Sequence, residues 1–123
     1  MLYDAPPDLL DRELVLDFFW KFSVFEYALK REGFLRAGRK NSAEPDWNSF
    51  GRSIAGRFQD MNSNSFCAAL EILEAAPPQR QIVRNDQLAW ETIVRQRGES
   101  REQFVLRLVK TARNNLFHGG KYP

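Results

Sequence analysis

The sequence predicts an all-α fold, a bundle of about four helices with one irregular or short hairpin excursion near residues 77–98. Apolar residues recur at helical spacing in separate stretches, which is the pattern of amphipathic helices. A hydrophobic content of 43%, with ten Phe and three Trp, is enough for one aromatic core in 123 residues. Because domains of this length are common, we expect one domain over residues 1–123.

The first predicted helix runs from Leu9 to about Ala37. Asp8 is its expected N-cap, and Asp11 and Glu13 place negative charge in its first turns. Its apolar line is broad, so we expect it to contact two neighbours in a bundle. The main line consists of Leu10, Leu14, Phe18, Phe22, Phe25 and Leu29.

Two shorter helices are expected after a polar loop at residues 39–44. One spans about residues 46–59, where two glycines weaken it. The other begins after a turn and cap at residues 62–65 and must end before Pro77. Cys67 falls among apolar residues of this helix, so we expect it to be a small core residue.

Residues 77–98 are the least helical part of the chain. The triplets Gln81-Ile82-Val83 and Leu88-Ala89-Trp90 favour two short extended pieces around a turn, a small hairpin. A short helix around residues 90–97 is the alternative.

The final predicted helix follows Ser100 and ends at His118, the only histidine. Ser100 and Gln103 have capping-box spacing, and Gly119 can close the helix in a left-handed cap. The predicted core face consists of Phe104, Val105, Leu108, Val109, Ala112 and Leu116. At a helix C-terminus, the unpaired carbonyls favour a protonated imidazole, so His118 is suited to proton transfer.

Positive charge gathers in the same half of the chain. Residues 1–76 hold 9 Lys and Arg against 12 Asp and Glu, whereas residues 77–123 hold 9 against 4. This excess is compatible with an anionic ligand near His118, although basic surfaces are often only solvated faces.

Arg113 and His118 stand five positions apart, which corresponds to about 500° of helical rotation. On one straight helix their side chains therefore point about 140° apart. The side chains of Arg113 and His118 can meet at one site only if the helix frays after Arg113, or if a second copy of the helix lies across a two-fold axis. We therefore expect a homodimer whose interface includes this helix.

The string Arg113-Asn-Asn-Leu-Phe-His118 resembles the Arg-x4–6-His motif of HEPN domains (higher eukaryotes and prokaryotes nucleotide-binding). The longer string ARNNLFHGGK is similar to bacterial HEPN-like proteins in particular. The resemblance implies a small helical bundle, a homodimer with facing motif helices, and often a metal-independent ribonuclease. It implies that His118 is the general acid or base, Arg113 holds the scissile phosphate, and Asn114 is the polar residue after the arginine.

The sequence departs from the family pattern in two ways. Some toxin members carry a tyrosine two residues after the histidine, where a partner nucleotidyltransferase modifies it. Here Gly120 stands at that position and Tyr122 lies four residues after His118, so the modification is not carried over. Only five residues follow His118, where HEPN domains continue into another helix, so we expect a truncated form or a face shared with a partner.

We therefore expect a metal-independent endoribonuclease related to bacterial toxins or defence, with RNA and a homodimeric copy as partners, and an antitoxin or nucleotidyltransferase as a possible further partner. Arg107, Lys110 and Lys121 are the expected RNA-binding residues, because cations near phosphates give salt-dependent affinity. A non-catalytic dimerising or RNA-binding module is the alternative, as is a purely structural motif in which Arg113 pairs with an acid and His118 is inert.

No cofactor and no metal are expected. One histidine without Asp or Glu at ligand spacing fits no zinc or iron site. The chain has no signal-like leader and no apolar run near the ~18 residues of a membrane span, so we expect a cytoplasmic protein without membrane contact.

Overall fold

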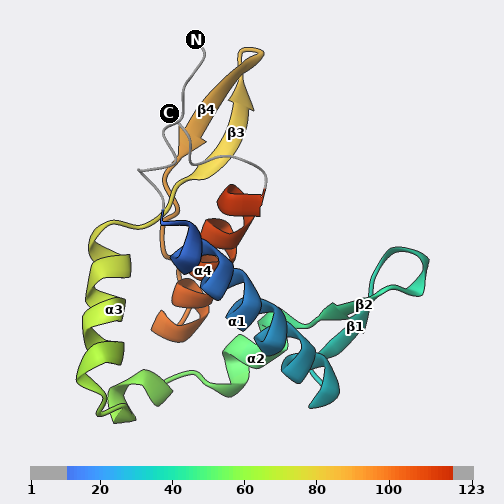
Figure 1. Ribbon diagram of the computed structural model, residues 1–123, viewed down its shortest axis with the longest axis vertical. Coiled ribbons are helices and arrows are strands. Elements are labelled where there is room, and N and C mark those ends of the chain that lie inside the picture. The colour runs from blue at the N-terminus through green and yellow to red at the C-terminus, as the bar shows by residue number, and fades with distance from the viewer. Residues whose placement is uncertain (1–10, 118–123) are drawn as a thin grey trace. The chain divides into compact units, whose positions relative to one another are not determined.

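The structure is a computed structural model that describes residues 11–117 (Figure 1). It contains four α-helices and two antiparallel two-stranded sheets. Because 59% of the described residues are helical and 15% lie in strands, the fold is mixed α/β and the predicted all-α class is wrong. The chain divides into two compact units and passes from one to the other between Phe50 and Gly51. Whether one domain covers residues 1–123 stays a prediction.

The first unit begins with α1 (Arg12–Arg31). Its N-cap is Asp11, whose Oδ1 accepts hydrogen bonds from the backbone amides of Glu13 at 2.9 Å and Leu14 at 3.2 Å. A carboxylate at this position satisfies amides that lack helical partners and complements the helix dipole. The cap predicted at Asp8 lies outside the described residues.

α1 ends six residues earlier than predicted, at Arg31 rather than Ala37. Gly33 has a φ of +98°, its amide donates to Lys30 at 3.3 Å, and the amide of Phe34 donates to Leu29 at 2.9 Å. These two bonds form a Schellman motif, which stops a helix where a glycine adopts the left-handed conformation. The apolar residues after Gly33 therefore leave the helix instead of extending it.

A small hairpin follows α1, where the sequence predicted the end of the first helix and then a polar loop. It pairs β1 (Leu35–Ala37) with β2 (Ala43–Pro45) around the 3-10 turn η2 (Arg39–Asn41). Lys40 and Asn41 both have positive φ, at 56° and 59°. Three-residue strands are too short for an alternating pattern to reveal them.

Aromatic rings form the core of the first unit. Phe22 is buried and lies 5.5 Å from Trp47 between ring centroids. Phe50 makes edge contacts with Phe25 at 5.4 Å and with Phe34 at 5.3 Å. Such tilted and edge-on pairs are favoured by the charge distribution of the rings. The apolar line predicted for the first helix is therefore confirmed only in part, because Phe22 and Leu29 are buried but Leu14 is 66% exposed.

Helix α2 (Trp47–Ser53) crosses from the first unit into the second and is shorter than the predicted residues 46–59. Gly56 has a φ of +82° and starts the separate 3-10 turn η3 (Arg57–Asp60). α3 (Asn64–Ala75) is capped by Ser63, whose Oγ accepts from the amide of Phe66 at 3.3 Å. Leu70 is buried in α3, but Cys67 is exposed, so the prediction that Cys67 is a core residue is wrong.

The predicted hairpin within residues 77–98 is confirmed. β3 (Arg80–Arg84) pairs with β4 (Gln87–Glu91), with Val83 opposite Leu88. Asn85 and Asp86 form the two-residue turn and have φ values of 53° and 62°. Two successive positive φ values define a type I′ turn, whose twist matches that of paired strands. The alternative helix over residues 90–97 is excluded.

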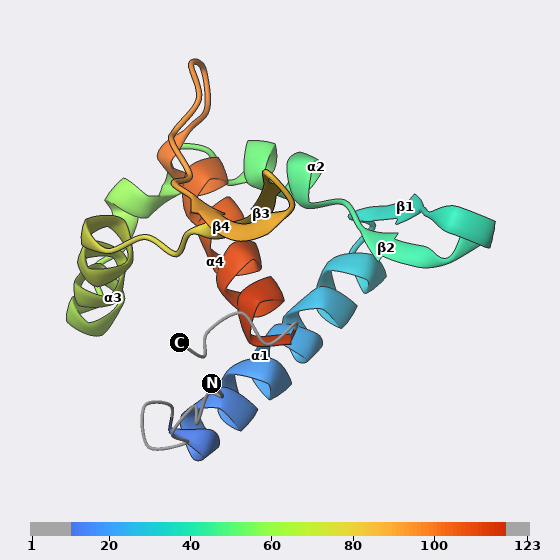
Figure 2. The same ribbon diagram turned by 90° about the horizontal axis from the view of Figure 1, so that it is seen from above.

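α4 (Arg101–Phe117) is the longest helix of the second unit and contacts α3, β3 and η3 (Figure 2). Leu108 is completely buried, and Val105 is 5% exposed. The predicted core face of the final helix is therefore confirmed at these positions. No helix in the described ranges is long and apolar enough to cross a membrane.

Candidate functional site

The start of α4 is fixed by two sets of hydrogen bonds. Ser100 Oγ accepts from the amide of Gln103 at 3.1 Å, and the amide of Ser100 donates to Gln103 Oε1 at 2.9 Å, so the predicted capping box is confirmed. Glu102 is 3% exposed and accepts from the amide of Phe58 at 2.8 Å. Burial opposes its charge, but the amides of Phe58 and Gly56 hold the pKa of Glu102 below its usual value.

Side chains along α4 attach it to the neighbouring elements of the same unit. Arg101 donates two hydrogen bonds to Glu74 of α3, at 2.9 and 2.6 Å, which is bidentate guanidinium–carboxylate geometry. Near the other end of α4, the buried side chain of Asn115 donates through Nδ2 to the backbone oxygen of Gln79 at 2.9 Å. These contacts hold α4 against α3 and the start of the β3–β4 hairpin.

Arg107 connects α4 to the segment that follows β4. It donates to Glu99 at 2.6 and 2.9 Å and to the backbone oxygen of Val94 at 2.8 Å. The hydrogen bonds from Arg107 hold the pKa of the Glu99 carboxyl below its usual value and raise the pKa of Arg107, although burial opposes both shifts. The positive charge of Arg107 is therefore balanced within the protein.

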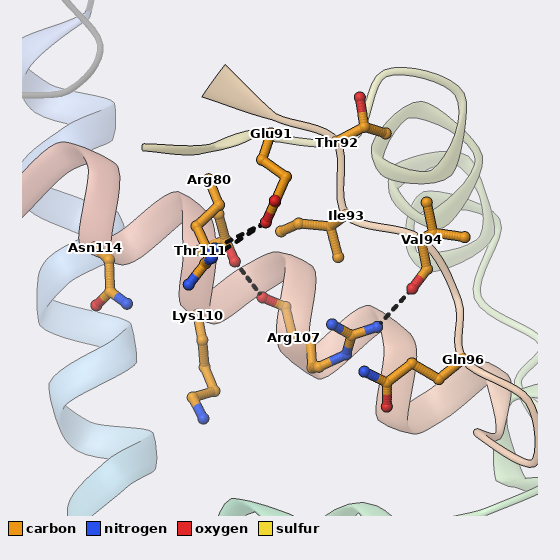
Figure 3. A pocket seen from close by; sticks show the side chains of 10 residues that line it. All are labelled: Arg80, Glu91, Thr92, Ile93, Val94, Gln96, Arg107, Lys110, Thr111 and Asn114. Atoms are coloured by element: carbon orange, nitrogen blue, oxygen red, sulfur yellow. Dashed lines mark hydrogen bonds and ion pairs between the residues drawn. The ribbon is translucent and has the colours of Figure 1, made fainter. Parts of the chain in front are cut away.

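A groove of about 470 Å³ lies between α4, the base of the hairpin and the segment after β4 (Figure 3). Basic, amide, hydroxyl and aliphatic side chains line it together, with Arg80 paired to Glu91 at 3.1 Å at one border. The lining residues are Arg80, Glu91, Thr92, Ile93, Val94, Gln96, Arg107, Lys110, Thr111 and Asn114.

A second cavity, of about 300 Å³, shares Arg80, Thr111 and Asn114 with this groove. Thr111 and Asn114 are three positions apart on α4, so they belong to one face of the helix. The hydroxyl of Thr111 donates to the backbone oxygen of Arg107 at 2.8 Å. Thr111 and Asn114 therefore bring a hydroxyl and an amide to both cavities.

Arg113 is held at the border of this face. Its Nη1 donates to Asn114 Oδ1 at 2.8 Å, and its guanidinium carbon lies 5.1 Å from the centre of the Phe117 ring. Cation–π contact and the hydrogen bond together orient the planar guanidinium. Because Asn114 also lines both cavities, it connects Arg113 to the groove.

The structure brings together only part of the predicted site. Arg107, Lys110 and Asn114 line one groove, and Arg113 joins them through Asn114. His118 and Lys121 lie outside the described residues. Since α4 is helical through Phe117, the helix does not fray between Arg113 and that residue. The expected homodimeric site stays a prediction.

Several residues of the groove were missed by sequence reasoning. Arg80 and Thr111 line both cavities, yet neither stands in a recognisable motif. Glu99, which neutralises Arg107, is eight positions before it and outside the helix. No helical spacing predicts that pair, because it depends on how residues 92–99 fold back onto α4.

Among residues 11–117, no three His, Cys, Asp or Glu side chains gather closely enough to hold a metal ion. The expectation of a metal-free and cofactor-free site stays a prediction.

Comparison with known proteins gives no relative: no family model, no curated protein and no solved structure matches this chain. The resemblance to HEPN domains therefore stays an expectation carried by residues 113–118.

Proposed function

We propose that this protein binds single-stranded RNA along the groove of α4 and cleaves it, without a metal, at a site formed by Arg113, Asn114 and His118. The observation that carries the proposal is the position of Arg113. Its guanidinium is oriented by Asn114 and Phe117 at the end of α4, beside a polar groove, and His118 directly follows Phe117 in the sequence.

The groove supports RNA as the ligand. Lys110 supplies a cation for phosphate oxygens, and Thr111, Asn114 and Gln96 supply hydrogen-bonding groups. Ile93 and Val94 offer apolar surface beside them. Recognition of single-stranded RNA commonly combines such polar contacts with apolar contact to unstacked bases.

The proposed reaction is an internal transfer at phosphorus. Neutral His118 removes the proton of a 2′-hydroxyl, the 2′-oxygen attacks phosphorus, and the bond from phosphorus to the 5′-oxygen breaks. The leaving oxygen receives its proton from water or from the protonated His118 of a second copy. Arg113 stabilises the negative charge that grows on the phosphoryl oxygens in the transition state.

A labelled single-stranded RNA and a DNA of the same base sequence test this proposal. The wild-type protein is expected to bind both and to cleave only RNA, because DNA lacks the attacking 2′-hydroxyl. His118→Ala should bind RNA without cleaving it. Arg113→Lys keeps the charge but loses the planar fork, so it should bind and lose most turnover. Cleavage that survives in His118→Ala rules the proposed chemistry out.

A non-catalytic RNA-binding module is the second candidate. The mixed α/β fold favours it, because the HEPN resemblance implies a purely helical bundle and the two hairpins depart from that arrangement. RNA binding that depends on salt, with no cleavage by the wild-type chain, would select this candidate.

A further inference from the structure

Helix α1 carries apolar side chains on two opposite faces, and among the residues that the structure describes only one of these faces is packed. Phe22 and Leu29 are buried, and Phe22 contacts Trp47. At about 100° per residue, four other apolar residues fall within an arc of about 80° on the roughly opposite face. We call them the outer stripe: Leu16, Trp20, Val24 and Tyr27, which are 68%, 71%, 51% and 59% exposed.

Opposite charges stand at the two ends of the outer stripe. Glu13 precedes Trp20 by seven positions, and Arg31 follows Val24 by seven positions. Both lie on the helical line of the stripe, because seven residues make about two turns. The guanidinium carbon of Arg31 lies 5.8 Å from the centre of the Tyr27 ring, which holds the positive charge at that end.

We infer that the outer stripe of α1 binds the outer stripe of a second copy of this chain, with the two helices antiparallel. A two-fold axis between positions 20 and 24 places Trp20 of each copy opposite Val24 of the other. The same axis places Glu13 of each copy opposite Arg31 of the other, so two ion pairs flank the apolar contact. The stripe is thus complementary to itself, as a symmetric interface requires.

The charges of Glu13 and Arg31 determine the relative orientation of the two helices. They also favour a second copy of this chain as the partner that binds the outer stripe. A parallel pair would place Glu13 against Glu13 and Arg31 against Arg31, so like charges disfavour it. An exposed row of Trp, Tyr, Leu and Val is also typical of association surfaces, which are enriched in aromatic residues. The described residues of α4 include only one large exposed hydrophobic, Phe117 at 64%. The sequence-based expectation of an interface on that helix therefore has less apolar surface to support it.

Analytical ultracentrifugation of the full chain tests the apolar contact. Wild type is expected to be a dimer at micromolar concentration. Trp20→Ser should raise the dissociation constant by about 30-fold or more, the loss typical of a central aromatic residue. Leu14→Ser is the matched control, because Leu14 is 66% exposed on α1 but lies outside the stripe. A monomeric wild type, or equal effects of both variants, would overturn the inference.

A charge exchange tests the antiparallel register with surface variants. Glu13→Arg and Arg31→Glu should each weaken the dimer, because each single variant creates two like-charge contacts. The double variant exchanges the charges and should restore the wild-type dissociation constant. If the double variant dimerises as weakly as the single variants, and circular dichroism shows that all three are folded, the antiparallel register is wrong. Neither measurement depends on RNA, so failure here and failure of the proposed function are distinguishable.

Discussion

The guanidinium of Arg113 donates to the side-chain oxygen of Asn114 at 2.8 Å, although neighbouring residues on a helix normally point about 100° apart. The long arginine side chain turns toward the groove that Asn114 lines. In the proposed site, Asn114 therefore positions the guanidinium of Arg113.

Substitution of the two consecutive asparagines should separate function from stability. Asn114 is exposed, so Asn114→Ala should change the free energy of unfolding by less than about 0.5 kcal/mol and lower RNA cleavage. Asn115→Ala leaves the backbone oxygen of Gln79 without its buried donor and should cost roughly 1–3 kcal/mol. Urea denaturation and a cleavage assay on both variants provide the comparison. If Asn114→Ala destabilises the protein more than Asn115→Ala does, the assignment of Asn114 to function and of Asn115 to stability is wrong.

The core of the second unit should depend on Leu108. Leu108→Ala removes a completely buried side chain and should cost roughly 2–5 kcal/mol in unfolding free energy. Leu88→Ala is the matched control, because Leu88 is 67% exposed on β4 and should cost less than about 0.5 kcal/mol. Equal midpoints of urea denaturation for the two variants would show that α4 does not form this core.

Stability should fall in acid because of three carboxyls. The pKa values of Glu74, Glu99 and Glu102 are lowered in the folded protein from an ordinary value of 4.5. A lowered folded pKa adds stability that is complete above pH 4.5 and is lost as the pH falls through the folded pKa values. Glu99→Gln should therefore make the pH dependence of the unfolding free energy shallower below pH 4.5. An unchanged slope would mean that the Arg107–Glu99 pair does not persist in solution.

Arg107 lines the groove, but Glu99 balances its charge, so we expect Arg107 to contribute little to RNA affinity. Lys110→Gln should reduce the slope of log affinity against log salt by about 0.7, the value for one phosphate contact on a single strand. The double variant Arg107→Gln/Glu99→Gln removes an internally balanced pair and should leave the slope unchanged. Fluorescence anisotropy over a salt series measures both. A larger effect of the double variant would assign the phosphate contact to Arg107.

Local signals allowed some elements to be predicted. The Ser100–Gln103 capping box and the apolar spacing up to Leu108 are complete within one helix, so the sequence predicts the start and core face of α4. The β3–β4 hairpin is also local, because its strands are joined by the two-residue turn Asn85-Asp86.

Features that depend on a single backbone angle or on tertiary contact were not predictable. The φ of +98° at Gly33 ends α1, although apolar Phe34 and Leu35 prolong its hydrophobic pattern. Cys67 belongs to an apolar run, but α3 turns it to solvent. In the candidate site, the polar face of α4 follows from helical spacing, whereas the contribution of Arg80 requires the position of the hairpin.

The product of RNA cleavage in excess EDTA tests the central claim most directly. With a 2′-hydroxyl as the nucleophile and His118 as the base, the upstream fragment should end in a 2′,3′-cyclic phosphate, and the yield should not change when the chelator is added. Mass spectrometry of a defined single-stranded RNA identifies that terminus, with His118→Ala as the inactive control. A 3′-hydroxyl terminus paired with a 5′-phosphate, or cleavage that disappears with EDTA, would contradict the proposed chemistry.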